Sequence, residues 1–367
     1  MPRYSPLHET HRALGAKLAD FGGWEMPIEY PANSGGGVLN EHTSVRERVG
    51  LFDVSHLGKA EVIGDDALEF LNQILTNDLE KIEDGQAQYT LICDDSSGGV
   101  VDDLIVYRKN RNEFLLVPNA ANTAEVVRRM QSAVGNARVQ ISECHEKYGV
   151  LALQGPKSDA VLESLGLSVN LEYMSFQISQ IGGSEVIVCR TGYTGERGYE
   201  LLPIWSETKK VWHLLAGAVS NFGGLVCGLG ARDTLRTEMG YPLHGHELSL
   251  EITPVQASAG WAVGWKKARF WGKAKLENER ESGARKSLRG LKVLDRGIPR
   301  LGMPVQISGN SVGVVTSGTF SPTLKYGIAL ALLDSDVTPG TQVEIEVRGR
   351  LLPAEVVKPP FVNSHVK

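Results

Sequence analysis

The sequence has few cysteines, and none is placed for metal binding or thiol redox chemistry. No two of them form a Cys-x-x-Cys pair, and the four lie far apart, as Cys93, Cys144, Cys189 and Cys227. Such spacing excludes the common zinc and dithiol motifs. Three of them lie among apolar neighbours (LICDD, VIVCRT and LVCGLG), where a free cysteine behaves as a small buried hydrophobe. We therefore expect no bound metal.

Excess positive charge and long apolar runs are also missing. The formal net charge is −5, whereas a general nucleic-acid binder normally presents a basic surface. The longest apolar runs fall far short of the roughly 18 residues that a membrane-spanning helix needs. The first stretch, MPRYSPLHETHRALGAKLADF, lacks the apolar segment of a secretory signal. We expect a cytoplasmic protein that binds neither nucleic acid nor membrane.

Several catalytic motifs are absent or incomplete. The sequence has no GxxxxGK[ST] loop and no GxSxG elbow. GLGARD (228–233) lacks the third glycine of a dinucleotide fingerprint and predicts a turn into a helix, on which Arg232 and Arg236 share a face. These two side chains are either solvated or aimed at a carboxylate or an anionic ligand. HGH (244–246) has no partners spaced to complete a metal site, so we expect a solvated loop there.

The elements that are present predict an α+β protein of several domains. At 367 residues the chain is too long for one ordinary core. Apolar periodicity predicts helices over 10–20, 40–50, 65–75, 119–135 and 207–224. Strand patterns occur at 51–56 and 59–64, three times within 88–118, and twice within 178–204. Residues 277–290 are polar and predict a linker, and the short strand signals that follow predict a small all-β barrel.

Two adjacent acids stand inside a buried strand pattern. In GGVVDDLIVY (98–107), Asp102 and Asp103 interrupt an apolar, β-branched run. Successive side chains of a strand point to opposite faces, so only one of the two can face a given cleft. An acid that faces inward is costly unless it is paired, protonated or used in chemistry. The pair is therefore a candidate catalytic site.

A glycine-rich segment supplies aromatic rings and carboxylates. TGYTGERGYE (191–200) combines tight turns with Tyr193, Tyr199, Glu196 and Glu200. Such a set suits a planar heteroaromatic ligand whose amino and ring N–H groups need a carboxylate partner. A glycine-rich hairpin without a ligand is an equally good explanation of this segment alone.

Together these motifs resemble the T-proteins of the glycine cleavage system, the aminomethyltransferases. The resemblance is carried, in chain order, by FGGWEMPIEY, LFDVSHLGKAEV, GGVVDDLIVY, ALQGP, TGYTGERGYE, CGLGARDTLRTEMGYPLHG, TSGTFSPTLKYGIALA and KPPFV. It implies a three-domain cloverleaf around a central folate pocket. The implied domains are 1–50 with 150–275 (folate-binding), 51–149 (carrying the catalytic acid) and 285–367 (the barrel).

The resemblance also implies a reaction and roles for particular residues. The family transfers the methylene carbon of an aminomethyl group, carried on the lipoyl arm of the H-protein, to tetrahydrofolate. The products are 5,10-methylenetetrahydrofolate, ammonia and dihydrolipoyl H-protein. By motif match Asp103 is the catalytic acid, which accepts a hydrogen bond or proton from N10 of the folate, and Asp102 is its structural partner. Tyr193, Glu200 and Arg232 line the pterin end, with Asn119 as a further contact.

Two other functions and two departures from the family pattern stay open at this point. The chain could be a non-enzymatic folate-binding accessory protein or a tetrahydrofolate-dependent demethylase. Leu57 stands where relatives commonly have methionine. The tail after PPFV is short, so we expect it to lack a folate contact that some relatives have there. Transient docking of the H-protein would draw on basic residues, with candidates at Lys147, Lys266, Lys267, Arg269, Arg285, Lys286 and Arg289.

Overall fold

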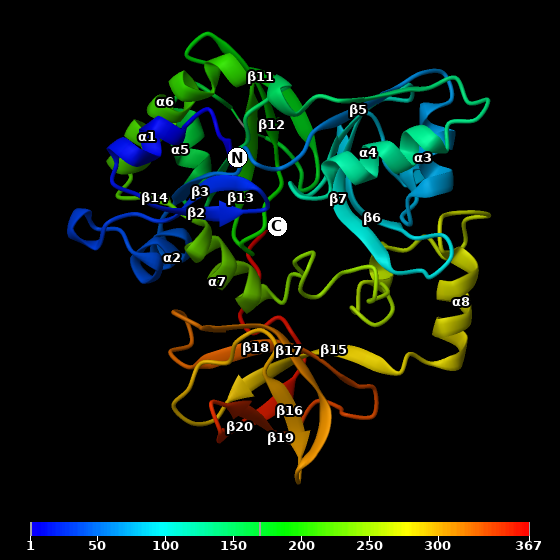
Figure 1. Ribbon diagram of the computed structural model, residues 1–367. Coiled ribbons are helices and arrows are strands. Elements are labelled where there is room, and N and C mark those ends of the chain that lie inside the picture. Colours follow the sequence, from blue (N-terminus) through cyan, green and yellow to red (C-terminus); the bar gives the residue numbers. More distant parts are fainter. Residues whose placement is uncertain (1, 169, 367) are drawn as a thin grey trace.

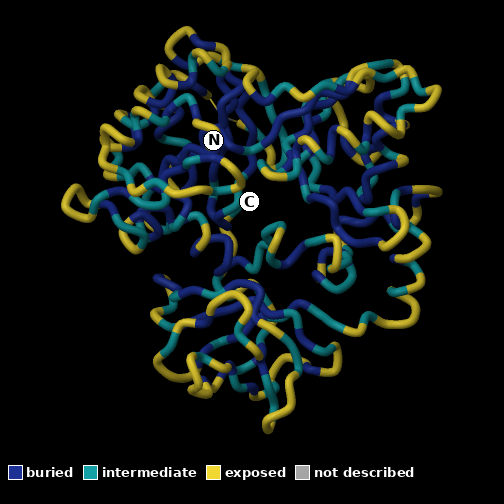
Figure 2. The backbone as a smooth tube through the Cα atoms, viewed as in Figure 1, coloured by how far each residue is buried: buried dark blue, intermediate teal, exposed yellow. Residues whose placement is uncertain are grey.

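Three lobes organise the chain in the computed structural model, which describes residues 2–168 and 170–366. Figure 1 shows a mixed α/β lobe at the upper left, a second at the upper right and a β-barrel below them. Figure 2 shows buried backbone inside each lobe and exposed turns around the rim. The expected α+β architecture with a C-terminal all-β barrel is therefore confirmed.

The upper-left lobe is built on a six-stranded sheet of order β11-β12-β13-β10-β4-β14. Its strands are β4 (Gly50–Asp53), β10 (Leu151–Gln154), β11 (Phe176–Ile181), β12 (Ser184–Cys189), β13 (Gly198–Pro203) and β14 (Leu225–Cys227). Helices α5 (Ser158–Ser164) and α6 (Thr208–Asn221) pack on the sheet through a core that includes Leu51, Val188 and Trp212. The order places β13, which ends the glycine-rich segment, in the middle of the sheet.

A small three-stranded sheet of order β1-β3-β2 flanks this lobe. It contains β1 (Arg3–Tyr4), β2 (Lys17–Phe21) and β3 (Trp24–Glu29), beside helices α1 (His8–Ala13), α2 (Val38–Glu47) and α7 (Leu229–Met239). The helix predicted over 10–20 is wrong beyond Ala13. Gly15 follows α1 in the left-handed region at φ +72°, and the chain then pairs as β2 with β3. Strand pairing here overrides local helix propensity.

The upper-right lobe is a five-stranded sheet of order β6-β7-β8-β5-β9. Its strands are β5 (Ala60–Ile63), β6 (Gln86–Cys93), β7 (Val100–Asn110), β8 (Glu113–Val117) and β9 (Gln140–Glu143). Helices α3 (Ala67–Ile74) and α4 (Thr123–Ser132) lie within the predicted helices 65–75 and 119–135. The three strands predicted within 88–118 also form, and the first of them begins two residues earlier, at Gln86; their alternation matches a half-buried sheet.

Strand β7 presents its two acids to different environments. Leu104 and Val106 belong to the apolar core that α3 and α4 share, whereas Ile105 and Tyr107 pack in the cluster shared with the six-stranded sheet. By alternation Asp102 lies on the first face and Asp103 on the second. The register with β6 shifts just beyond the pair, between Ile92 and Cys93, as in a β-bulge. Asp103 therefore faces the junction between the two lobes.

The C-terminal barrel closes with six strands in the order β15-β18-β17-β16-β19-β20. They are β15 (Lys286–Val293), β16 (Pro304–Ile307), β17 (Asn310–Phe320), β18 (Gly327–Asp334), β19 (Gln342–Val347) and β20 (Arg350–Val357), around an apolar interior. Helix α8 (Lys273–Ser282) leads into it at the right of Figure 1. The predicted polar linker 277–290 is thus the end of α8 followed by the start of β15.

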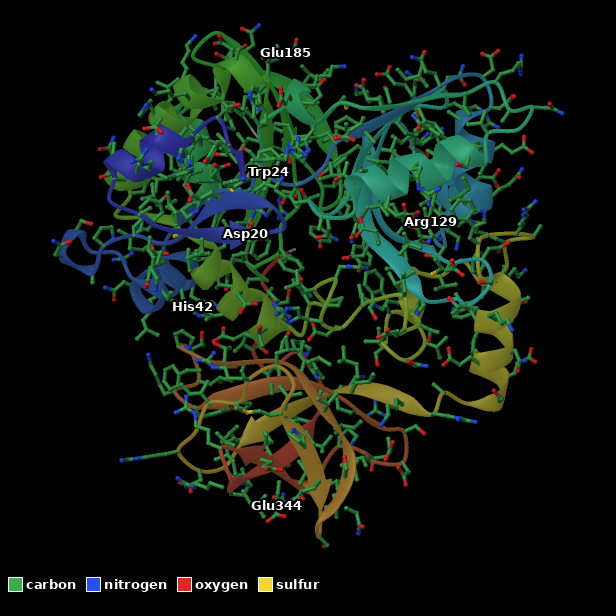
Figure 3. The ribbon with its side chains drawn as sticks, in the orientation of Figure 1. Asp20, Trp24, His42, Arg129, Glu185 and Glu344 are labelled. Atoms are coloured by element: carbon green, nitrogen blue, oxygen red, sulfur yellow. The ribbon has the colours of Figure 1, made fainter. Side chains whose placement is uncertain are left out.

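Polar side chains join the barrel to the upper-left lobe. His42 of α2, labelled in Figure 3, contacts Thr234 Oγ1 of α7 at 2.7 Å and Thr323 Oγ1 of the barrel at 3.0 Å. Glu238 of α7 accepts hydrogen bonds from the hydroxyls of Ser321 and Thr323. Because His42, Glu238 and Ser321 are buried and all these groups are paired, the contacts fix the barrel against α7. Among the described residues, no helix is long and apolar enough to cross a bilayer.

Candidate functional site

Asp103 is held by two neutral donors. The Tyr89 hydroxyl donates to Asp103 Oδ2 at 3.0 Å, and Asn119 Nδ2 donates to Asp103 Oδ1 at 2.8 Å. The side chain is half-buried. Burial raises the pKa of Asp103 above its ordinary value, and the hydrogen bond from Tyr89 opposes that rise. Such a carboxylate is oriented, partly accessible and more basic than a solvated one.

Asp102 ties down the loop that follows β8. It is fully buried and accepts from the Asn119 backbone N–H at 2.9 Å, from Asn119 Nδ2 at 2.9 Å and from Asn122 Nδ2 at 2.6 Å. Burial and the neighbouring charge of Asp103 raise the pKa of Asp102. The two acids face different sides of the strand, yet the Asn119 amide reaches both. Asp102 therefore fixes the group that holds Asp103.

Tyr193, Glu200 and Arg232 converge from the glycine-rich segment and helix α7. The guanidinium carbon of Arg232 lies 4.8 Å from the Tyr193 ring centroid, a cation–π contact. Burial lowers the pKa of Arg232, and the negative charge of Glu200 opposes that shift. Glu200 is buried and accepts from Thr191 Oγ1 at 2.7 Å. A carboxylate, a cation and an aromatic face are thus gathered in one place.

Two observations connect this group to Asp103 and to a polar ligand. Burial raises the pKa of Tyr193, Arg236 opposes that shift, and the charge of Asp103 adds to it. Arg232 Nη1 is buried without a hydrogen-bond partner among the described residues. A buried donor without a partner and a nearby carboxylate suit a heteroaromatic ligand, which can accept a hydrogen bond from Arg232 and donate one to Glu200.

Two aromatic residues near Asp103 were not singled out from the sequence. Tyr89, whose hydroxyl holds Asp103, stacks on Trp261 with ring centroids 5.1 Å apart, and Trp261 is 70% exposed. In the register between β6 and β7, Leu91 faces Asp103, so Tyr89 is its diagonal neighbour. The pairing of QYTLIC with VVDDLIVY was the signal that could have revealed Tyr89.

The two arginines of GLGARDTLR, Arg232 and Arg236, lie in different environments. Arg236 is buried and pairs with Glu247 at 3.0 Å and with Asp233 at 2.7 Å, next to the barrel residue Ser317. Only Arg232 lies in the candidate site. The expectation of a solvated loop at HGH is wrong, because His244 and His246 are half-buried and hydrogen-bonded.

The C-terminal tail returns to the glycine-rich segment. The His365 backbone N–H donates to the Gly195 carbonyl at 2.7 Å, and His365 Nδ1 lies 3.1 Å from Glu196 Oε2. Glu196 also accepts from Arg46 at 2.9 Å. Glu196 is therefore occupied by structural contacts and, unlike Glu200, is not a candidate for ligand binding.

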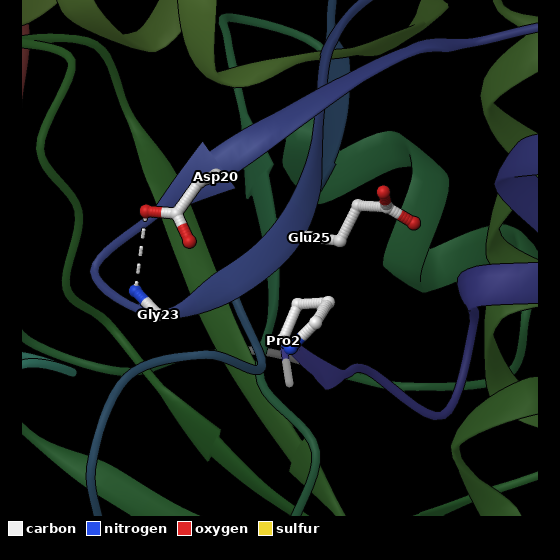
Figure 4. Close-up of a pocket in the computed structure, with 4 residues that line it drawn as sticks. All are labelled: Pro2, Asp20, Gly23 and Glu25. Carbon is white, nitrogen blue, oxygen red and sulfur yellow. Dashed lines mark hydrogen bonds between the residues drawn. The ribbon is translucent and has the colours of Figure 1, made fainter.

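An open pocket away from these residues lies near the N-terminus. Figure 4 shows its lining by Pro2, Asp20, Gly23 and Glu25. Its volume is about 460 Å³. It contains two carboxylates and none of the predicted site residues. The described residues hold no cluster of three or more histidine, cysteine, aspartate or glutamate side chains that could bind a metal.

One of the predicted docking residues is unsuitable. Lys267 is buried, and its ammonium group donates to the carbonyls of Leu75 at 2.6 Å and Asn77 at 2.8 Å. Burial lowers its pKa to about 8. Lys266 and Arg269 on the same segment are exposed.

Comparison with known proteins gives matches over nearly the whole chain. The family model described as GCVT N-terminal domain matches residues 7–267, and the glycine cleavage T-protein C-terminal barrel domain matches residues 286–363. The aminomethyltransferase of Parafrankia sp. (strain EAN1pec) is 58% identical over 363 residues, which cover 99% of this chain and 98% of that protein. The aminomethyltransferase of Mycobacterium tuberculosis (strain ATCC 25618 / H37Rv) is 54% identical over 361 residues, covering 98% and 96%. The crystal structure of glycine cleavage system aminomethyltransferase T from Bartonella henselae is similar with a TM-score of 0.92 at 33% identity, covering 100% of this chain and 99% of that one.

Proposed function

The chain belongs to the glycine cleavage T-protein family and is an aminomethyltransferase, and on that premise we propose that Asp103 carries the transfer to tetrahydrofolate. The donor is the aminomethyl group on the lipoyl arm of the H-protein. Its carbon–sulfur and carbon–nitrogen bonds break as the carbon bonds to N5 and N10 of the folate. The products are 5,10-methylenetetrahydrofolate, ammonia and dihydrolipoyl H-protein.

Asp103 acts as a hydrogen-bond acceptor or general base toward N10. Two supports are its half-buried position at the junction of the lobes and the pKa raised by burial. A carboxylate with a raised pKa accepts a proton more readily at neutral pH than a solvated one. Tyr89 and Asn119 orient it without supplying a positive charge that would quench its basicity. Positioned acid–base groups contribute about 10²–10⁴-fold to the rate.

The pterin ring of the folate lies against Tyr193, Glu200 and Arg232. The Glu200 carboxylate accepts from the 2-amino and N3–H groups, which form a planar pair of donors. The unpartnered Nη1 of Arg232 donates to a ring acceptor and so satisfies a buried donor that has no protein partner among the described residues. Asn119 contributes through Asp103, since its amide is engaged by both acids.

The remaining proposals concern arrangement and setting. Residues 1–50 with 150–275, residues 51–149 and residues 285–367 act as three domains that surround the folate. Lipoylated H-protein docks transiently, and most of the rate comes from holding both substrates in reacting geometry, an effect that reaches about 7–11 kcal/mol. The reaction needs no metal. The four cysteines are free thiols, which suits the reducing cytoplasm.

The observation that carries this proposal is the Asp103 carboxylate, held by Tyr89 and Asn119 in a chain that matches aminomethyltransferases end to end. The test is to incubate the protein with aminomethyl-lipoyl H-protein and tetrahydrofolate. We expect 5,10-methylenetetrahydrofolate and ammonia in equal amounts. Binding of tetrahydrofolate without ammonia release would indicate an accessory protein, and 5-methyltetrahydrofolate a demethylase. Neither alternative is favoured by the relatives.

A further inference from the structure

His244 contacts two segments that hold the acid pair, strand β7 and the start of α4. Its Nε2 is 3.2 Å from the carbonyl oxygen of Val100, which lies two residues before Asp102 on β7. Its Nδ1 is 3.0 Å from Nδ2 of Asn122, at the start of α4. Neither partner is near His244 in sequence, so a pattern read along the chain does not reveal the contact.

The hydrogen bonds assign the tautomer of this ring. The Val100 carbonyl can only accept, so Nε2 carries the hydrogen and donates it. Nδ1 is then an acceptor, and Asn122 Nδ2 donates one of its two hydrogens to it. The other hydrogen of Asn122 Nδ2 goes to Asp102 Oδ1 at 2.6 Å. The His244 ring, with Nδ1 as the acceptor, therefore fixes which way the Asn122 amide points.

The chain of contacts continues from Asp102 to Asp103. Asp102 accepts from both the backbone and the side-chain nitrogen of Asn119, and the same Asn119 Nδ2 donates to Asp103 Oδ1 at 2.8 Å. If Asn122 turned over, it would present its oxygen to the Asp102 carboxylate, and Asp102 would have to move or take up a proton. A shift of Asp102 would reach Asp103 through Asn119.

We propose that His244 is a positioning residue for the transfer, acting on Asp103 through Asn122, Asp102 and Asn119. This inference rests on the proposed function, in which Asp103 is the catalytic group. It gives a role to His244, one of the two histidines of the HGH motif. The proposed function assigns no role to this residue.

Two matched substitutions separate the two ring nitrogens. In His244→Asn, the side-chain oxygen takes the place of Nδ1 and can still accept from Asn122. In His244→Gln, the side-chain nitrogen takes the place of Nε2 and can still donate to Val100, but the acceptor for Asn122 is lost. We expect His244→Gln to lower kcat roughly 10- to 100-fold, the scale of a displacement of about 1 Å in reacting geometry. The KM for tetrahydrofolate should stay within about twofold, and His244→Asn should retain most of kcat.

A double-mutant cycle tests the route of the effect. Asn122→Ala should lower kcat by a similar factor, and adding His244→Gln to it should cost little more, because both changes break one network. This variant also keeps the proposal testable if His244→Gln folds poorly. His246→Gln is the matched control, since His246 Nδ1 contacts the barrel at Thr316 O and Ser317 Oγ instead. It should leave kcat unchanged.

Asp103→Asn is assayed beside these variants, with thermal unfolding of each recorded. A wild-type kcat in His244→Gln, together with an inactive Asp103→Asn, would overturn this inference and leave the proposed function intact. Equal losses in both His244 variants, or multiplicative losses with Asn122→Ala, would also overturn it. An active Asp103→Asn would overturn the proposed function and this inference with it.

Discussion

Replacing Glu200 with alanine tests how the proposed site recognises the folate. The carboxylate is buried, accepts from Thr191 Oγ1 at 2.7 Å and lowers the cost of burying the Arg232 cation. The substitution removes the acceptor that we propose for the pterin 2-amino and N3–H groups. It also leaves Arg232 without that nearby negative charge, so some loss of stability should accompany the loss of binding.

The expected magnitude follows from the charge of the acceptor. A hydrogen bond to a charged group is worth about 1.5–3 kcal/mol. Losing at least one such bond should raise the Kd for tetrahydrofolate roughly 10- to 150-fold. Thr191→Val removes only a donor that orients the carboxylate and leaves the carboxylate in place, so it should raise the Kd for tetrahydrofolate less than Glu200→Ala does.

Anaerobic titration calorimetry with tetrahydrofolate measures both variants against the wild type. Circular dichroism and thermal unfolding confirm that each variant is folded at the titration temperature. A Glu200→Ala protein that is folded and binds tetrahydrofolate within about twofold of the wild type would remove Glu200 from the site. A larger effect in Thr191→Val than in Glu200→Ala would assign the recognition to the hydroxyl.

Three further outcomes are expected. Tyr89→Phe removes a donor that lowers the pKa of Asp103, so the acid limb of the kcat profile should move to higher pH; an unmoved limb would show that this hydroxyl does not act on the reacting carboxylate. His56 and His145 are buried, and desolvation lowers both pKa values to about 3. Between about pH 6.5 and 3 the unfolded chain therefore binds protons that the folded one does not, and the unfolding free energy should fall as pH falls, by up to about 1.4 kcal/mol per pH unit for each histidine. Denaturant titrations of His56→Asn should show a shallower fall than the wild type, and parallel curves would contradict the assignment. Lys266→Glu should raise the KM for aminomethylated H-protein and make this KM less dependent on salt, whereas the KM for tetrahydrofolate should not change. If the wild-type KM for H-protein stays constant up to about 0.5 M salt, electrostatic docking is contradicted.

Local patterns predicted the elements whose burial follows from their own periodicity. Helix α3 and the strands β6 to β8 formed where alternation or a 3.6-residue period indicated them. The prediction failed at Lys17–Phe21, where a strand partner overrides helix propensity. The sequence also did not predict which strands pair with one another. Strand β4, for example, pairs with β10 and β14, which are far away in the sequence.

The candidate site shows the same division. The motifs predicted Asp103, Tyr193, Glu200 and Arg232 as site residues, and the fold brings Arg232 to 4.8 Å from the Tyr193 ring. The sequence could not indicate that Tyr89 would hold Asp103 or that His244 would contact Asn122, because both contacts join segments that are separate in the chain. Likewise, the sequence predicted Lys267 as an exposed docking residue, whereas the fold buries its side chain.

The comparison of Asp103→Asn with Asp102→Asn, in single turnovers at saturating substrates, tests the central claim most directly. Formation of 5,10-methylenetetrahydrofolate should slow by about 10²–10⁴-fold in Asp103→Asn while the Kd for tetrahydrofolate stays near the wild-type value. Asp102→Asn removes an acceptor from Asn119 and Asn122, so it should lower stability and slow the transfer less. If both variants fold and Asp102→Asn is the slower one, or if Asp103→Asn transfers the carbon at the wild-type rate, Asp103 is not the catalytic group.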